Sequence, residues 1–159
     1  MKARIDVMHV SPGIIHAMLG LERQVQKAGL DSKLLDLVRM RASQINGCAY
    51  CLDMHSKDAR AKGETEQRLY GLDAWRETPY YSPRERAALD WTEALTLVSE
   101  TRVPDEVYER VREQFSEEEL ANLSLAIVAI NGWNRLNVAA RTVPGDYVPG
   151  NAAAALAGS

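Results

Sequence analysis

The chain has 159 residues, of which 46% are hydrophobic and 26% are charged, and its formal net charge at pH 7 is −3. This length and composition are typical of one globular domain that buries its own core. The net negative charge argues against nucleic acid or an anionic membrane surface as a partner. No apolar run reaches membrane length and the first residues lack the apolar segment of a signal peptide, so we expect a cytoplasmic protein.

Two amphipathic helices are predicted in the first third of the chain. The first covers residues 11–29, with Ser11 as its N-cap, Pro12 in its first turn and Gly29 at its end. The second covers residues 31–45 and begins at Asp31. Its apolar residues fall on one stripe, which should face the core. The stripe contains Leu34, Leu35, Val38, Ala42 and Ile45.

Gly47 interrupts the helical pattern, and a separate helix is predicted over residues 48–63. A weaker helical segment covers residues 64–77 and is broken near Gly71. The clearest helix covers residues 82–100, because Ser82, Pro83 and Glu85 form an N-cap, a first helical position and a capping box. Its buried stripe is expected to contain Ala88, Trp91, Ala94 or Leu95, and Val98.

A short helix is predicted from Pro104, carrying Val107, Val111 and Phe115. A capping box at Ser116 then opens a long helix that should end before Pro144. No segment shows the alternation, bounded by turns, that predicts strands. We therefore predict one all-α domain of about six to eight helices over residues 1–145. A C-terminal tail, 146–159, follows, and its low-complexity end is expected to be disordered.

The run INGWNR places polar and aromatic residues in the otherwise apolar last helix. They are Asn131, Trp133, Asn134 and Arg135. Buried amides need hydrogen-bond partners, so we predict that these asparagines make helix-to-helix or subunit contacts.

The two cysteines of the chain, Cys48 and Cys51, are separated by two residues, and His55 follows four residues after the second. On a helix these three positions fall within about 60° of arc and face one way. Cys48 should lie in the first helical turn, where free N–H groups and the helix dipole lower a thiol pKa. His55, one turn beyond Cys51, can exchange a proton with a thiol or a leaving oxygen. The pattern favours two-electron thiol chemistry ending in a disulfide.

Other roles for the pair are open from the residues alone. Both cysteines could be small buried apolar residues. With His55 they could also bind a metal ion, although no further motif completes a structural zinc site. Covalent haem attachment requires a histidine directly after the second cysteine, where this chain has Leu52. A thioredoxin-like fold requires a strand before the motif, whereas the preceding residues have a helical period.

Three segments of the chain resemble the AhpD-like (alkylhydroperoxidase D) branch of the carboxymuconolactone decarboxylase family: DLVRMRASQINGCAYCLDMHSKDARAKG, LDAWRETPYYSPRERAALDWTEALT and AIVAINGWNRLNVAAR. The resemblance runs from about Leu34 to Arg141. It implies an all-α helical bundle, a homo-oligomer (trimer or hexamer) and peroxidase activity through the cysteine pair. No bound cofactor is implied, because sulfur performs the chemistry. Decarboxylases of the family lack this pair, so Cys48 and Cys51 indicate the redox branch.

The resemblance also implies a role for each site residue. Cys51 would be the peroxidatic thiol, Cys48 the resolving thiol and His55 a member of the proton relay. The acidic relay residue of the family is a glutamate twelve positions before the first cysteine, where this chain has Asp36. Catalytic hydrogen bonds need heavy atoms within about 2.6–3.2 Å, so the shorter Asp36 would need a bridging water or would work less well. Alternatively, Asp36 is a solvated acid that stabilises the first turn of its helix.

We therefore predict a thiol-dependent hydroperoxide reductase whose partners are a hydroperoxide and an external dithiol or thiol-redox protein. One alternative is a non-catalytic, redox-sensing helical oligomer in which the disulfide is a switch. Another is a decarboxylase-like enzyme that acts on a small lactone and in which the cysteines are incidental.

Overall fold

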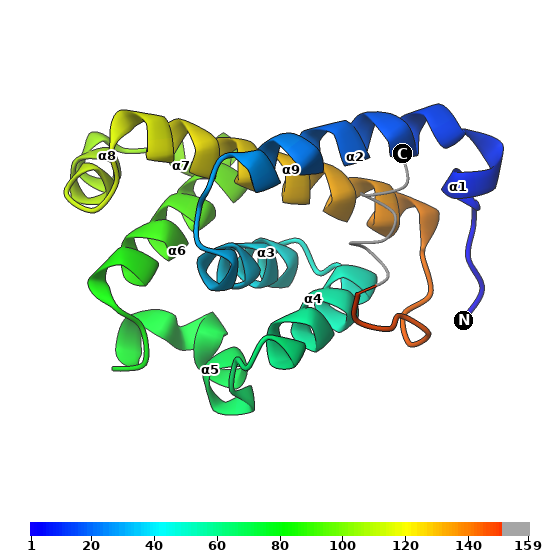
Figure 1. Ribbon diagram of the computed structural model, residues 1–159, viewed down its shortest axis with the longest axis horizontal. Coiled ribbons are helices and arrows are strands. Elements are labelled where there is room, and N and C mark those ends of the chain that lie inside the picture. Colours follow the sequence, from blue (N-terminus) through cyan, green and yellow to red (C-terminus); the bar gives the residue numbers. More distant parts are fainter. Residues whose placement is uncertain (151–159) are drawn as a thin grey trace.

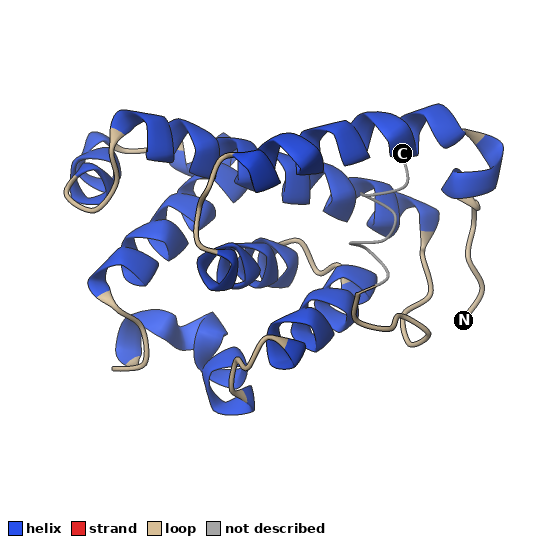
Figure 2. Cartoon of the chain, viewed as in Figure 1, coloured by secondary structure: helices blue, strands red, loops and turns tan. Residues whose placement is uncertain are grey.

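The structure is a computed structural model that describes residues 1–150, and all of its regular elements in that range are helices (Figures 1 and 2). The prediction of an all-α fold is confirmed. The elements in chain order are α1 (Val7–Val10), α2 (Pro12–Lys27), α3 (Ser32–Ile45), α4 (Ala49–Ala61), α5 (Glu66–Gly71), the 3-10 helix η1 (Leu72–Glu77), α6 (Pro83–Thr96), α7 (Val98–Thr101), α8 (Asp105–Arg112) and α9 (Glu117–Ala140). Residues 151–159, the low-complexity end of the predicted tail, lie outside the described residues. Up to residue 150, no helix has the length and apolar character needed to cross a bilayer.

Helix α3 is the centre of the fold. It packs against α4, α6 and α9, and Figure 1 shows it nearly end-on between these helices. Leu34 and Val38 belong to a core cluster shared with α6, α8 and α9. Leu37 and Met40 belong to a second cluster shared with α4, α5, η1 and α6, while Leu35 packs with residues of α2 and α9. The predicted single stripe is therefore only part of the buried surface, because α3 is covered on several sides.

The helix starts read from the sequence are confirmed at α3, α6 and α9. The Asp31 side chain accepts a hydrogen bond at the start of α3. Ser82 with Glu85, and Ser116 with Glu119, form the two predicted capping boxes. Each cap binds backbone N–H groups that the first turn of a helix leaves without partners.

The helix predicted over residues 82–100 is confirmed up to Thr96, but its last residues do not continue it. Helix α6 ends before Leu97, and the short helix α7 follows. Thr101 turns back and donates its hydroxyl to the carbonyl oxygen of Ala94 at 2.7 Å. This change of direction carries Val98, predicted to be buried, to the surface, where it is 50% exposed.

Two smaller differences concern the ends of helices. Helix α8 stops at Arg112, so Phe115 lies beyond the helix predicted to carry it, although it is still buried. Helix α1 was not predicted; its four residues begin after Asp6, whose side chain accepts a hydrogen bond from the backbone N–H of His9. Short elements such as α1 and α7 raise the number of helices in residues 1–150 above the predicted six to eight.

The segment after α9 returns to the side of α4, as the orange and red trace of Figure 1 shows. The Lys57 ammonium donates to the carbonyl oxygens of Gly145 and Tyr147 at 2.8 and 3.2 Å. Asp53 accepts from the backbone N–H of Gly145 at 3.1 Å, and the Tyr147 hydroxyl donates to Asp58 at 2.8 Å. The described beginning of the predicted tail is thus held against α4.

Candidate redox site

The loop between α3 and α4 places both cysteines at the start of α4. Gly47 adopts a φ of +63°, which glycine tolerates better than any other residue, and Cys48 follows it. Cys48 and Cys51 are joined by a disulfide, with their Cα atoms 5.3 Å apart. Cys48 is the N-cap of α4 and not part of its first turn as predicted, because its backbone is extended. Its sulfur accepts a hydrogen bond from the backbone N–H of Cys51 at 3.3 Å.

Two asparagine side chains on α9 hold this loop in place. Asn46, two residues before Cys48, donates to the side-chain oxygens of Asn131 and Asn134 at 3.0 and 2.9 Å. Asn134 is fully buried and donates to the hydroxyl of Ser43 at 3.0 Å. The predicted helix-to-helix role of these asparagines is confirmed. Because they join the end of α3 to α9, they fix the position from which α4 begins.

His55 lies one turn beyond Cys51, and both residues are buried. Burial lowers the pKa of the imidazole to about 3, and the positive charges of Arg39 and Lys62 act in the same direction. His55 is therefore uncharged at neutral pH, and its surroundings in this structure oppose a positive charge on the ring. Within residues 1–150, its ring makes no hydrogen bond to either sulfur or to Asp36.

Asp36 is buried and paired with basic side chains. It is 3% exposed, so the solvated acid considered from the sequence is wrong. The Lys62 ammonium lies 2.9 and 2.7 Å from its two carboxylate oxygens, and a guanidinium nitrogen of Arg39 lies 3.8 Å from one of them. Burial raises the pKa of the Asp36 carboxyl, while these two cations act to lower it. The carboxylate is thus directed at Lys62 and not at the sulfurs.

Replacing Lys62 with methionine is expected to lower the free energy of unfolding by about 1–3 kcal/mol at pH 7. The change removes the main partner of a buried carboxylate, and the loss is moderated because the Lys62 side chain is 43% exposed. The loss should shrink at pH 4, where protonation of Asp36 relieves the unpaired charge. Urea unfolding at both pH values measures the effect, with Lys33→Met, at an exposed position, as the control. A loss below about 0.5 kcal/mol at pH 7 would contradict this pairing.

Sequence reasoning missed two residues of the site. Lys62 lies at the far end of α4, and its partner Asp36 is on α3. Asn137, on α9, has its side-chain nitrogen 3.8 Å from the sulfur of Cys51. The spacing of three residues between Asn131, Asn134 and Asn137 indicates one polar face of α9. Only the fold shows that this face meets the start of α4.

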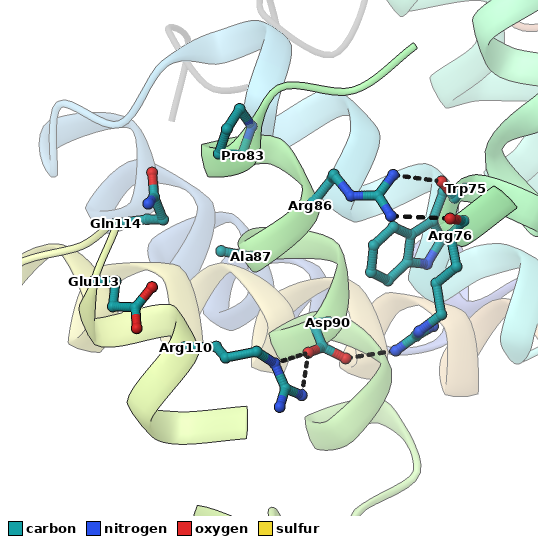
Figure 3. A pocket seen from close by; sticks show the side chains of 9 residues that line it. All are labelled: Trp75, Arg76, Pro83, Arg86, Ala87, Asp90, Arg110, Glu113 and Gln114. Atoms are coloured by element: carbon teal, nitrogen blue, oxygen red, sulfur yellow. Dashed lines mark hydrogen bonds and ion pairs between the residues drawn. The ribbon is translucent and has the colours of Figure 1, made fainter. Parts of the chain in front are cut away.

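A surface hollow of about 480 Å³ lies between η1, α6 and α8 (Figure 3). The arginines that line the hollow are paired with other lining residues. Arg76 and Arg110 form ion pairs with Asp90, and Arg86 donates to backbone carbonyls, including that of Trp75. None of the lining residues belongs to α4, so the hollow is separate from the disulfide.

Residues 12–94 match the model of the carboxymuconolactone decarboxylase family. The chain is 45% identical over 139 residues to the protein YdfG of Bacillus subtilis. The matched region covers 87% of this chain and 95% of YdfG. It is 30% identical over 119 residues to YnjA of Escherichia coli, and this matched region covers 75% of this chain and 64% of YnjA.

Solved structures share the fold. A crystal structure of an Agrobacterium tumefaciens protein of unknown function, provisionally assigned as the antioxidant defence protein AhpD, is 42% identical, with a TM-score of 0.89 over 92% of this chain and 100% of that one. The debrominase Bmp8 is 22% identical, with a TM-score of 0.77 over 94% of this chain and 78% of that one, a likeness of fold alone. The chain therefore belongs to the carboxymuconolactone decarboxylase family, and within it to the AhpD-like branch.

Proposed function

We propose that this protein is a thiol-dependent hydroperoxide reductase that cycles Cys48 and Cys51 between dithiol and disulfide. The observation that carries the proposal is a disulfide at the start of α4 with an uncharged His55 one turn away. The similarity to a protein assigned to AhpD supports it. We expect a homo-oligomer, a trimer or hexamer, that works without a bound cofactor in the reducing cytoplasm, where dithiols can regenerate it.

The reaction that these residues support has two chemical steps. His55 accepts the proton of the Cys51 thiol, because the negative charge that forms on the sulfur beside it raises the pKa of the imidazole, and the thiolate attacks the terminal oxygen of the hydroperoxide. The O–O bond breaks, an S–O bond forms, and the leaving alkoxide takes the proton from His55. The Cys48 thiol then attacks the sulfenic acid, the disulfide forms and water leaves. An external dithiol reduces the disulfide, so one hydroperoxide and one dithiol become an alcohol, water and an oxidised dithiol.

Asp36 acts on this chemistry through Lys62. Burial is the main cause of the low pKa of His55, and the cations Arg39 and Lys62 lower this pKa further. Asp36 binds Lys62 and lies near Arg39, so its negative charge offsets theirs at the imidazole. We assign Asp36 the role of adjusting the basicity of His55, in place of a direct contact with the thiols.

A redox sensor is the second candidate. The observation that favours it is the burial of both cysteines, each 1% exposed, because an enzyme must admit its substrate to the attacking sulfur. A sensor needs only slow oxidation and a change of state. A decarboxylase-like reaction on a small lactone is the third candidate, and activity that survives replacement of both cysteines would identify it.

Counting thiols during reaction with a hydroperoxide tests the proposal. Reduced protein given excess hydroperoxide should lose both free thiols and consume one equivalent of peroxide. With an external dithiol present, consumption should continue over many turnovers. Oxidation that stops at one equivalent with every dithiol offered would favour the sensor. Survival of both thiols would rule out the peroxidase and the sensor together.

A further inference from the structure

We propose that the side chain of Asn137 is a catalytic hydrogen-bond donor that stabilises the thiolate of Cys51. The inference rests on the proposed function, in which Cys51 is the attacking sulfur. Asn137 lies near the C-terminal end of α9, and its Nδ2 atom is 3.8 Å from the Sγ atom of Cys51. The contact crosses from α9 to α4, two helices that pack against each other.

A second hydrogen bond fixes which end of the amide faces the sulfur. Nδ2 of Asn137 also donates to the backbone carbonyl oxygen of Trp133 at 2.9 Å. If the amide were turned over, its oxygen would face that carbonyl oxygen, and two acceptors would meet. An amide nitrogen carries two hydrogens, so one N–H serves Trp133 and the other is available to Cys51.

The chemical value of this donor depends on the state of the sulfur. A disulfide sulfur is a weak acceptor, whereas a thiolate is charged and forms a much stronger hydrogen bond. The donor therefore favours the reduced, ionised form of Cys51 over its neutral thiol. His55 carries a positive charge only after it has accepted the proton of Cys51, whereas the Asn137 amide is a donor in either protonation state of the imidazole.

Asn137 also distinguishes the two sulfurs of the pair. Cys48, as the N-cap of α4, has a backbone N–H as its hydrogen-bond donor. Cys51 lies within the first turn of α4 and has a side-chain donor from another helix, together with His55 one turn away. The helix start favours ionisation of either sulfur, so the donor that belongs to Cys51 alone is what selects it for attack.

The pH dependence of Cys51 alkylation by iodoacetamide tests the role of Asn137. In a Cys48→Ser background, Asn137→Leu should raise the pKa of Cys51 by about one unit. It should slow the reaction with hydrogen peroxide about tenfold at pH values below that pKa, which corresponds to about 1.4 kcal/mol. Asn137→Gln keeps a donor and should recover part of the rate. Asn122→Leu, near the other end of α9, is the control and should change neither value.

A Cys51 pKa within about 0.3 units of the parent in the folded Asn137→Leu protein would overturn the inference. If that protein does not fold, Asn137→Asp has the same shape and no donor, and it should raise the pKa further; an unchanged or lowered pKa there overturns the inference too. Alkylation needs no peroxidase activity. A protein that consumes no peroxide but whose Cys51 pKa depends on Asn137 would therefore refute the proposed function and leave the role of Asn137 standing.

Discussion

Replacing Cys51 with serine is expected to reduce steady consumption of hydroperoxide by at least about a thousandfold, because the nucleophile of the first step is lost. Cys48→Ser should have a different effect. Its Cys51 can still attack one hydroperoxide, but no second thiol closes the disulfide, so the reaction should stop at a sulfenic acid. The two variants together distinguish the attacking thiol from the resolving thiol. Burial cannot distinguish them, because both cysteines are buried to the same extent.

Mass spectrometry after one equivalent of hydroperoxide measures this difference. Cys48→Ser should gain one oxygen atom, which a sulfenic acid reagent traps, and Cys51→Ser should gain none at early times. Ser56→Ala, also on α4, is the matched control and should behave as the unchanged protein. The reverse result would show that the N-cap position of Cys48 outweighs the surroundings of Cys51. Peroxide consumption by Cys51→Ser at the original rate would refute the mechanism.

The sequence predicts those parts of the fold that depend on local chemistry. Capping boxes at Ser82 and Ser116 are recognisable because each involves side chains and backbone groups three residues apart. The break at Leu97 is not recognisable in this way, since a continuing helix satisfies the same apolar pattern. Its cause is the turn of Thr101 back onto Ala94, together with the packing that α6 makes against α8 and α9.

The same distinction applies to the candidate site. Cys48, Cys51 and His55 could be grouped from the sequence because they lie within one helix and its N-cap. The partner of Asp36 is 26 residues away along the chain, and Asn137 is 86 residues from Cys51. Such contacts depend on how α3, α4 and α9 pack. The resemblance named Asp36 as the acidic group, but only the packing shows that Lys62 binds it.

Replacing His55 with glutamine is expected to remove a large part of the acid sensitivity of the fold. The folded protein keeps the imidazole uncharged down to about pH 3, whereas in the unfolded chain it takes up a proton near its ordinary value of 6.5. Between these values the unfolded state binds more protons, so the free energy of unfolding falls as the pH falls. From pH 7 to 4.5, this group should cost the unchanged protein about 2–3 kcal/mol. The glutamine variant should lack this loss.

Urea unfolding at a series of pH values gives this difference directly, because the carboxyl groups that also titrate are common to both proteins. His16→Gln, which replaces an exposed histidine on α2, is the control and should keep the acid sensitivity of the unchanged protein. Parallel curves for His55→Gln and the unchanged protein would mean that His55 takes up its proton equally well in the folded state. The low folded-state pKa attributed to the burial of His55 would then be wrong.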